Sequence, residues 1–132
     1  MLGADLVKPE ADLLTAYDDP LGVTGAFNRN LLVRINRELG GDFDLHAFRH
    51  RAVWNTCASR IEMHLVSTRA QRVHVTQCEL DIAFREGEHI WTESSYKFLP
   101  DTVSTRLLEA GFLPHEQWID AEAQFSLTLA AA

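Results

Sequence analysis

The chain has 132 residues, a length that suits one ordinary domain, and its 46% hydrophobic and 23% charged residues are typical of a soluble globular protein. Its formal net charge of −7 at pH 7 would repel nucleic acid and anionic membranes, so neither is expected as a partner. No stretch approaches the roughly 20 apolar residues that cross a bilayer, and the first ten residues lack a secretory signal pattern. Cys57 and Cys78 lack CxxC spacing, which favours reduced thiols and a cytoplasmic location.

The N-terminal third predicts a strand followed by two helices. Residues 2–7 are typical of the end of a short buried strand, and Pro9 suits the first turn of a helix that runs to Ala16. A turn cluster at residues 18–22 precedes a second helix over residues 22–39, which Gly40-Gly41 would end. Apolar residues recur at four-residue spacing in this second helix and predict its packed face. They are Val23, Phe27, Leu31, Ile35 and Leu39, with Leu32 widening the stripe.

After a short helical segment within residues 42–48, the apolar period changes from near 3.6 to 2, which predicts strands. In the segment RIEMHLVS, Ile61, Met63 and Leu65 would share one face. Because parallel neighbours need long crossovers, strands this close in sequence predict an antiparallel meander. The expected strands cover residues 51–55, 60–67, 73–75, 79–84 and 92–98.

The C-terminal third changes character again. Pro100 and Asp101 begin a helix that Gly111 closes, and strands are expected at about 112–119 and 124–130. The two ends of the chain therefore indicate α/β structure, while the middle predicts a small antiparallel sheet behind a helix. The ends supply too few strands for a complete α/β sheet, so we expect the chain to be part of something larger.

The segment TESSYKF places a carboxylate and a hydroxyl on one face of a predicted strand. Glu93 and Ser95 would lie about 7 Å apart along the backbone, since alternate residues share a face. The face is either solvated, with Glu93 paired to Lys97, or it lines a polar pocket. The opposite face would carry Ile90, Thr92, Ser94, Tyr96 and Phe98.

Three segments together resemble one enzyme family. They are AYDDPLGVTGAFNRNLLVRINRELGGDFDLHAFRHRA at 16–52, RIEMHLVS at 60–67 and GEHIWTESSYKF at 87–98. In order and spacing they resemble the C-terminal half of the S-adenosylmethionine-dependent L-histidine Nα-methyltransferases of ergothioneine biosynthesis. The resemblance implies an α+β fold. A small antiparallel sheet with a packed helix, the substrate-binding insertion, would be flanked by the last strands and helices of an incomplete class I methyltransferase Rossmann-like sheet.

By this resemblance residues 1–22 and 91–132 are Rossmann-like and residues 23–90 form the insertion, all within one compact unit. Binding the donor requires a glycine-rich turn after a first strand, and the seven glycines form no such cluster. The S-adenosylmethionine site of the complete enzyme is therefore expected to be missing from this chain. The resemblance implies the substrate-recognition half of a methyltransferase, inactive alone, which a separate donor-binding half or self-association would complete.

The resemblance also implies roles for five residues in binding L-histidine. Glu93 and Ser95 would contact the imidazole ring, Tyr17 the carboxylate, and Phe27 and Met63 the pocket wall. A ring N–H can donate to Glu93 while the other nitrogen accepts from Ser95, and a protonated ring would instead make Ser95 an acceptor. From the residues alone, Tyr17 could be a packing residue at a helix end, and Phe27 and Met63 could be core. No catalytic side chain is expected, because methyl transfer to an amine depends mainly on positioning.

Two other interpretations concern a metal site and a non-enzymatic function. His46 and His50 are four apart and could share a helix face, but no cysteine or acidic residue completes a metal site, so no metal is expected. The alternative function is a non-enzymatic module, derived from such an enzyme, that binds a small ligand or a partner. An incomplete sheet with open edges and an uncovered apolar face would suit such a module.

Overall fold

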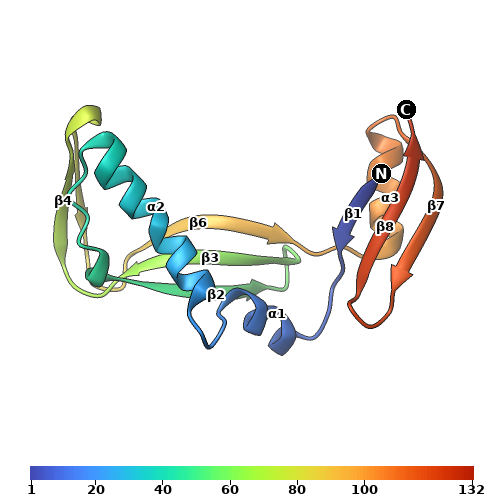
Figure 1. Ribbon diagram of the computed structural model, residues 1–132, viewed down its shortest axis with the longest axis horizontal. Coiled ribbons are helices and arrows are strands. Elements are labelled where there is room, and N and C mark those ends of the chain that lie inside the picture. The colour runs from blue at the N-terminus through green and yellow to red at the C-terminus, as the bar shows by residue number, and fades with distance from the viewer.

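A three-stranded antiparallel sheet lies at the centre of the computed structural model, which describes residues 1–132 (Figure 1). Its strands are β2 (Phe48–Asn55), β3 (Arg60–Ser67) and β6 (His89–Tyr96), in the order β2-β3-β6. β3 is therefore the central strand, with both of its edges paired.

A separate hairpin lies at one end of this sheet (Figure 1). It consists of β4 (Gln71–Val75) and β5 (Leu80–Phe84), joined by the short helix η2 (Thr76–Cys78), while η1 (Leu45–Ala47) precedes β2. The antiparallel pairing agrees with the prediction, but a continuous meander is wrong. β4 and β5 form a sheet of their own, with one further bridge from Val75 to Gly41, and the chain then returns to place β6 beside β3.

A second three-stranded antiparallel sheet lies at the other end of the molecule (Figure 1). It contains β1 (Leu2–Asp5), β8 (Phe125–Ala131) and β7 (Leu113–Asp120), in the order β1-β8-β7. The helix α3 (Pro100–Glu109) packs against β7 and β8. The fold is thus α+β with antiparallel sheets and three helices, and none of these helices is both long and apolar enough to cross a membrane.

One face of the central sheet is covered by α1 (Glu10–Tyr17) and α2 (Val23–Leu39). Asp19 caps α2, because its carboxylate accepts hydrogen bonds from the backbone N–H of Val23 (3.0 Å) and of Thr24 (2.7 Å). These bonds favour the ionised form and lower the pKa of Asp19 to about 2.

The packed face of α2 differs from the predicted stripe. Val23, Phe27 and Leu31 are 65%, 68% and 41% exposed. The buried side of the helix is instead formed by Gly25, Asn28 and Leu32. The prediction is confirmed for Leu32 and for Ile35, which packs against the same core cluster, and is wrong for Val23, Phe27 and Leu31. The polar residue Asn28 occupies a buried position that apolar periodicity does not select.

The core contains two neighbouring apolar clusters on the helix-covered face. The predicted shared face of Ile61, Met63 and Leu65 is confirmed, and none of the three is more than 3% exposed. One cluster comprises Leu13, Ile61 and Met63. The other comprises Leu32, Phe43, Phe48, Leu65, Val73, Val75 and Phe84.

Truncating Leu32 to alanine should lower the free energy of unfolding by about 2–5 kcal/mol, because the residue is fully buried in the larger cluster. The matched control is Leu31→Ala on the same helix, where partial exposure predicts a loss of about 1 kcal/mol or less. Urea denaturation measures both. Equal losses would contradict the packing of α2.

Candidate functional site

Strand β6 carries a bulge where it passes the middle of β3. Met63 pairs with Glu93, whereas the next residue, His64, pairs with Trp91. Thr92 is therefore left without a partner, and its hydroxyl donates to the carbonyl oxygen of Met63 at 2.9 Å. Such a bulge shifts the alternation of side chains along the strand.

The bulge corrects the predicted faces of this strand. Strict alternation predicted Ile90 on the face opposite Glu93. Ile90 pairs with Leu65 and Glu93 pairs with Met63, and these two partners point to the same side of β3. Ile90 thus contributes to the core, and Glu93 and Ser95, which follow the bulge, share its face.

The shared face of Glu93 and Ser95 is confirmed by the register, since their partners Met63 and Ile61 are two residues apart on β3. This face is the one that the two helices cover. Glu93 lines a pocket of about 210 Å³ between α2 and β6, together with Phe27 and Met63. The structure thus brings three of the five predicted residues to one pocket. The other residues lining it are Asn28, Asn30, Leu31, Arg34 and Thr92.

The remaining two predicted residues, Tyr17 and Ser95, touch each other. The Tyr17 hydroxyl and Ser95 Oγ are 2.6 Å apart. Lys97 Nζ donates to both, at 2.8 Å to Tyr17 and 2.9 Å to Ser95. Its third contact is Asp5 Oδ2 at 2.8 Å. Tyr17, at the end of α1, and Ser95, in β6, are 78 residues apart in sequence and therefore meet at one ammonium group.

Lys97 is the residue that the sequence did not single out for this site. It is only 3% exposed and its ion pair is with Asp5, whereas the sequence offered Glu93 as its partner. Spacing places Lys97 two residues after Ser95, which suggests the same face. Its burial depends on β1, whose position beside this segment the sequence does not indicate.

The Asp5 carboxylate receives two ammonium groups, from Lys97 and from Lys8 at 2.7 Å. Burial alone would raise the pKa of Asp5, but the hydrogen bonds from both lysines outweigh burial and hold this pKa below its usual value. Asp5 therefore stays ionised and balances the buried charge of Lys97.

A second chain of hydrogen bonds fixes the backbone of Tyr17. Asn28 Nδ2 contacts the carbonyl oxygen of His64 (3.3 Å) and Nδ1 of His50 (2.9 Å), so this ring nitrogen accepts. Nε2 of His50 then donates to the carbonyl oxygen of Tyr17 at 2.8 Å. His50 lies in β2 and His46 in η1, so the two do not share a helix face.

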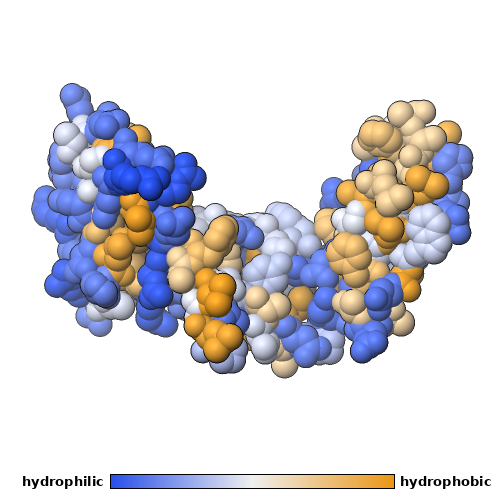
Figure 2. Space-filling model, in the orientation of Figure 1, coloured by the Kyte–Doolittle hydropathy of each residue, from blue (hydrophilic) through white to orange (hydrophobic).

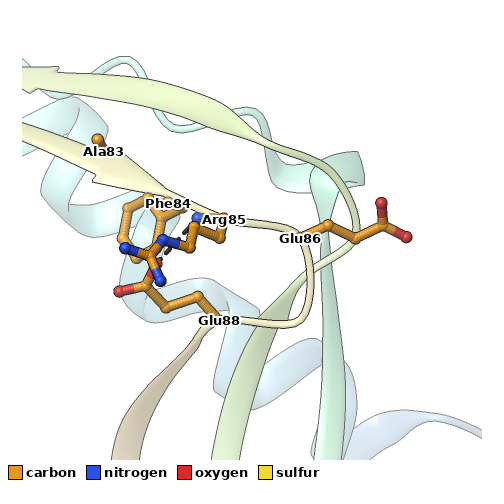
Figure 3. A pocket seen from close by; sticks show the side chains of 5 residues that line it. All are labelled: Ala83, Phe84, Arg85, Glu86 and Glu88. Carbon is orange, nitrogen blue, oxygen red and sulfur yellow. Dashed lines mark hydrogen bonds between the residues drawn. The ribbon is translucent and has the colours of Figure 1, made fainter.

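Another hollow lies at the turn between β5 and β6, away from all five predicted residues (Figure 3). At this turn the Glu88 carboxylate accepts from the backbone N–H of Arg85 at 2.9 Å, and the backbone N–H of Glu88 donates to the carbonyl oxygen of Arg85 at 3.1 Å. The side chain of Glu86 points away from those of Arg85 and Glu88 (Figure 3). None of the five predicted residues lines this hollow, so the pocket beside Glu93 remains the candidate site.

None of the glycines forms a turn that could cradle the methyl donor. Gly22 and Gly40 cap the two ends of α2 in left-handed conformations, and Gly41 packs against Ile35 and Asn36. Gly3 lies in β1 against the ring of Phe125. No glycine of this chain therefore lies between a strand and a following helix, where the backbone contacts of a nucleotide-type donor need one.

The whole chain, residues 1–132, matches the family described as histidine-specific methyltransferase, S-adenosylmethionine-dependent, and it belongs to that family. It is 49% identical over 130 residues to the histidine N-alpha-methyltransferase of Mycolicibacterium smegmatis, an alignment that covers 98% of this chain. It is 50% identical over 131 residues to the enzyme of the same name from Mycobacterium tuberculosis, covering 99% of this chain. The chain spans about 40% of the length of these curated relatives.

The Lys97→Met substitution should raise the pKa of Asp5, because it removes one of two hydrogen bonds that favour the carboxylate. In the unsubstituted chain the lowered pKa stabilises the fold above the ordinary aspartate pKa of about 3.9, and this stabilisation is lost as the pH falls through the folded-state value. In Lys97→Met this stabilisation should be smaller, and its loss should be complete at a higher pH, because the folded-state pKa lies closer to the unfolded-state value. NMR titration of the Asp5 carboxyl measures the change, and an unaltered Asp5 pKa would refute the contact.

Proposed function

We propose that this chain forms the substrate-recognition part of an enzyme that transfers methyl groups from S-adenosylmethionine to the α-amino group of L-histidine. The donor-binding part would lie outside these 132 residues. The observation that carries the proposal is the placement of Glu93 and Ser95 side by side on the helix-covered face, with Tyr17 hydrogen-bonded to Ser95. The family and both relatives are named for histidine, which supports the substrate.

Each of the five residues has a contact that suits histidine. In the proposal, Glu93 accepts from one ring N–H and Ser95 contacts the other ring nitrogen. Tyr17 donates to the substrate carboxylate, and Phe27 and Met63 wall the ring. Pockets for small molecules usually occupy about 300–1,000 Å³, so the 210 Å³ pocket is consistent with a site that another part of the enzyme closes.

The work assigned to this chain is binding and orientation. Methyl transfer to an amine is an in-line substitution, and holding the amine in place accounts for most of the acceleration. Donor chemistry would come from S-adenosylmethionine, which supplies an electrophilic methyl group. We assign no catalytic acid or base to this chain.

The sheet of β1, β7 and β8, with α3, would belong to the incomplete Rossmann-like part. Ser126 and Thr128 are fully buried on its α3 side, whereas Phe125, Leu127 and Leu129 point to the other side and stay 36–42% exposed. Apolar side chains therefore gather on the surface at this end of the molecule (Figure 2). The donor-binding half, or a second copy of the chain, would cover them.

The small sheet would be the insertion that recognises the substrate. Its expected span of residues 23–90 ends inside β6, which stays paired with β3 as far as Tyr96. Helix α1 also packs on this sheet, through Leu13. We therefore propose that the insertion runs from α1 to β6, and that residues 1–9 and 97–132 belong with the Rossmann-like part.

Substituting Glu93 by alanine should weaken L-histidine binding by about 1.5–3 kcal/mol, the range for hydrogen bonds to charged groups, or about 10- to 150-fold in affinity. The matched control is Ser94→Ala, one residue along on the opposite face, which should leave affinity unchanged. Isothermal titration of the 132-residue chain measures both variants. An unchanged affinity in Glu93→Ala would exclude this residue as a ring ligand.

The same chain should show no micromolar affinity for S-adenosylmethionine, because its glycines form no donor-binding turn. Calorimetric titration with the donor, in the presence and absence of L-histidine, tests this expectation. Micromolar donor binding by the isolated chain would overturn the proposed division between substrate and donor halves.

A further inference from the structure

We infer that this site takes L-histidine with its ring doubly protonated, because the hydrogen-bond network around Lys97 makes Ser95 an acceptor whenever Tyr17 holds the carboxylate. The inference rests on the proposed function, since it assigns Tyr17, Glu93 and Ser95 to the substrate. It adds the protonation state of the ligand and a coupling between two of its contacts.

The first step is a count of the donors on Lys97. An ammonium group has three N–H donors and no acceptor. The three acceptors within reach of Nζ are Asp5 Oδ2, the Tyr17 hydroxyl and Ser95 Oγ, all at 2.8–2.9 Å. Each hydroxyl oxygen therefore already accepts one hydrogen bond from Lys97, and no donor of Lys97 is left for a ligand.

The second step concerns the hydroxyl hydrogens of Tyr17 and Ser95. Their oxygens are 2.6 Å apart, so one hydroxyl donates to the other and only one hydroxyl hydrogen remains free. In the first arrangement Ser95 donates to Tyr17, and Tyr17 can donate outward. In the second arrangement Tyr17 donates to Ser95, whose two lone pairs are then filled, and only Ser95 can donate outward.

The third step compares these arrangements with a bound amino acid. A carboxylate has no hydrogen to donate, so its contact with Tyr17 requires the first arrangement. Ser95 then has one lone pair left and can only accept. The ring nitrogen that faces Ser95 must carry a hydrogen, and the nitrogen that faces the Glu93 carboxylate must carry one as well. A ring with two N–H groups is an imidazolium.

The other charged groups around the network are already engaged. Arg34 of α2 is paired with Glu38 at 3.1 Å, and Lys8 pairs with Asp5. His50 of β2 has both ring nitrogens in hydrogen bonds, with an exposed Asp18 carboxylate 4.0 Å from Nε2. Glu93 is therefore the carboxylate of the pocket that is left to accept from the ring.

The test is the affinity of the 132-residue chain for L-histidine between pH 5.5 and 7.5, compared with Tyr17→Phe. A ring of pKa about 6.5 bound only as imidazolium should lose about tenfold in affinity over this range. In Tyr17→Phe the Ser95 hydroxyl is released from Tyr17 and can donate or accept. Affinity in this variant should be lower overall and change less than about twofold with pH, since Ser95 then serves either ring form.

The outcomes separate the inference from the proposed function. A tenfold loss in the unsubstituted chain and a flat profile in Tyr17→Phe supports the inference. Equal losses in both chains would assign the pH dependence to the charge of Glu93 or to His50, and would overturn it. A flat or rising affinity in the unsubstituted chain overturns the inference and leaves histidine binding intact, whereas no binding at any pH overturns the proposed function itself.

A second measurement requires no substitution. L-histidine labelled with ¹⁵N in the ring, bound to the unsubstituted chain at pH 7.5, should show an attached hydrogen on both ring nitrogens in its NMR spectrum. The free amino acid at that pH is mostly neutral and provides the reference. A bound ring with one protonated nitrogen would overturn the inference even if Tyr17→Phe did not fold.

Discussion

The arrangement of the molecule depends on the buried ammonium of Lys97. Its three partners come from β1, α1 and β6, so one group joins the two sheets and one covering helix. Beyond it, few backbone bonds connect the sheets, among them Phe98 N–H to Asp5 and Val7 N–H to Phe98. A buried ammonium is costly unless every donor is satisfied, and here every donor is. The same contacts that join the two ends of the chain also set the orientation of the Tyr17 and Ser95 hydroxyls.

Periodicity predicted most of the elements, because the helix and strand patterns are local properties of the sequence. The face of β3 followed from strict alternation, and the shared face of Glu93 and Ser95 followed from a spacing of two. The packed face of α2 could not be predicted from the helix pattern alone. Asn28 is buried there because it forms hydrogen bonds with His50 and with the carbonyl oxygen of His64. These two partners lie on strands, and the sequence of the helix gives no information about them.

The site was predicted only in part, for a related reason. Resemblance assigned Tyr17 and Ser95 to different ends of a ligand, but not the 2.6 Å contact between them. The contact exists because Lys97 binds both hydroxyls, and the burial of Lys97 needs β1 beside β6. No residue pattern within β6 contains that information. The bulge at Thr92 could not be predicted either, because the sequence of β6 also suits a regular strand.

That bulge has a consequence for how such a chain could change in length. Ile90, before the bulge, faces the core. Glu93 and Ser95, after the bulge, lie on the same side of the sheet. Deleting the unpaired Thr92 would restore regular alternation and keep Ile90, Glu93 and Ser95 on one side, whereas deleting the paired Ser94 would turn either Glu93 or Ser95 outward. The β4–β5 hairpin forms a sheet of its own, apart from a bridge between Val75 and Gly41, so its turn could lengthen or shorten without moving Glu93 or Ser95. Insertions and deletions should therefore be tolerated at the hairpin turn and rejected between the paired residues Glu93 and Ser95.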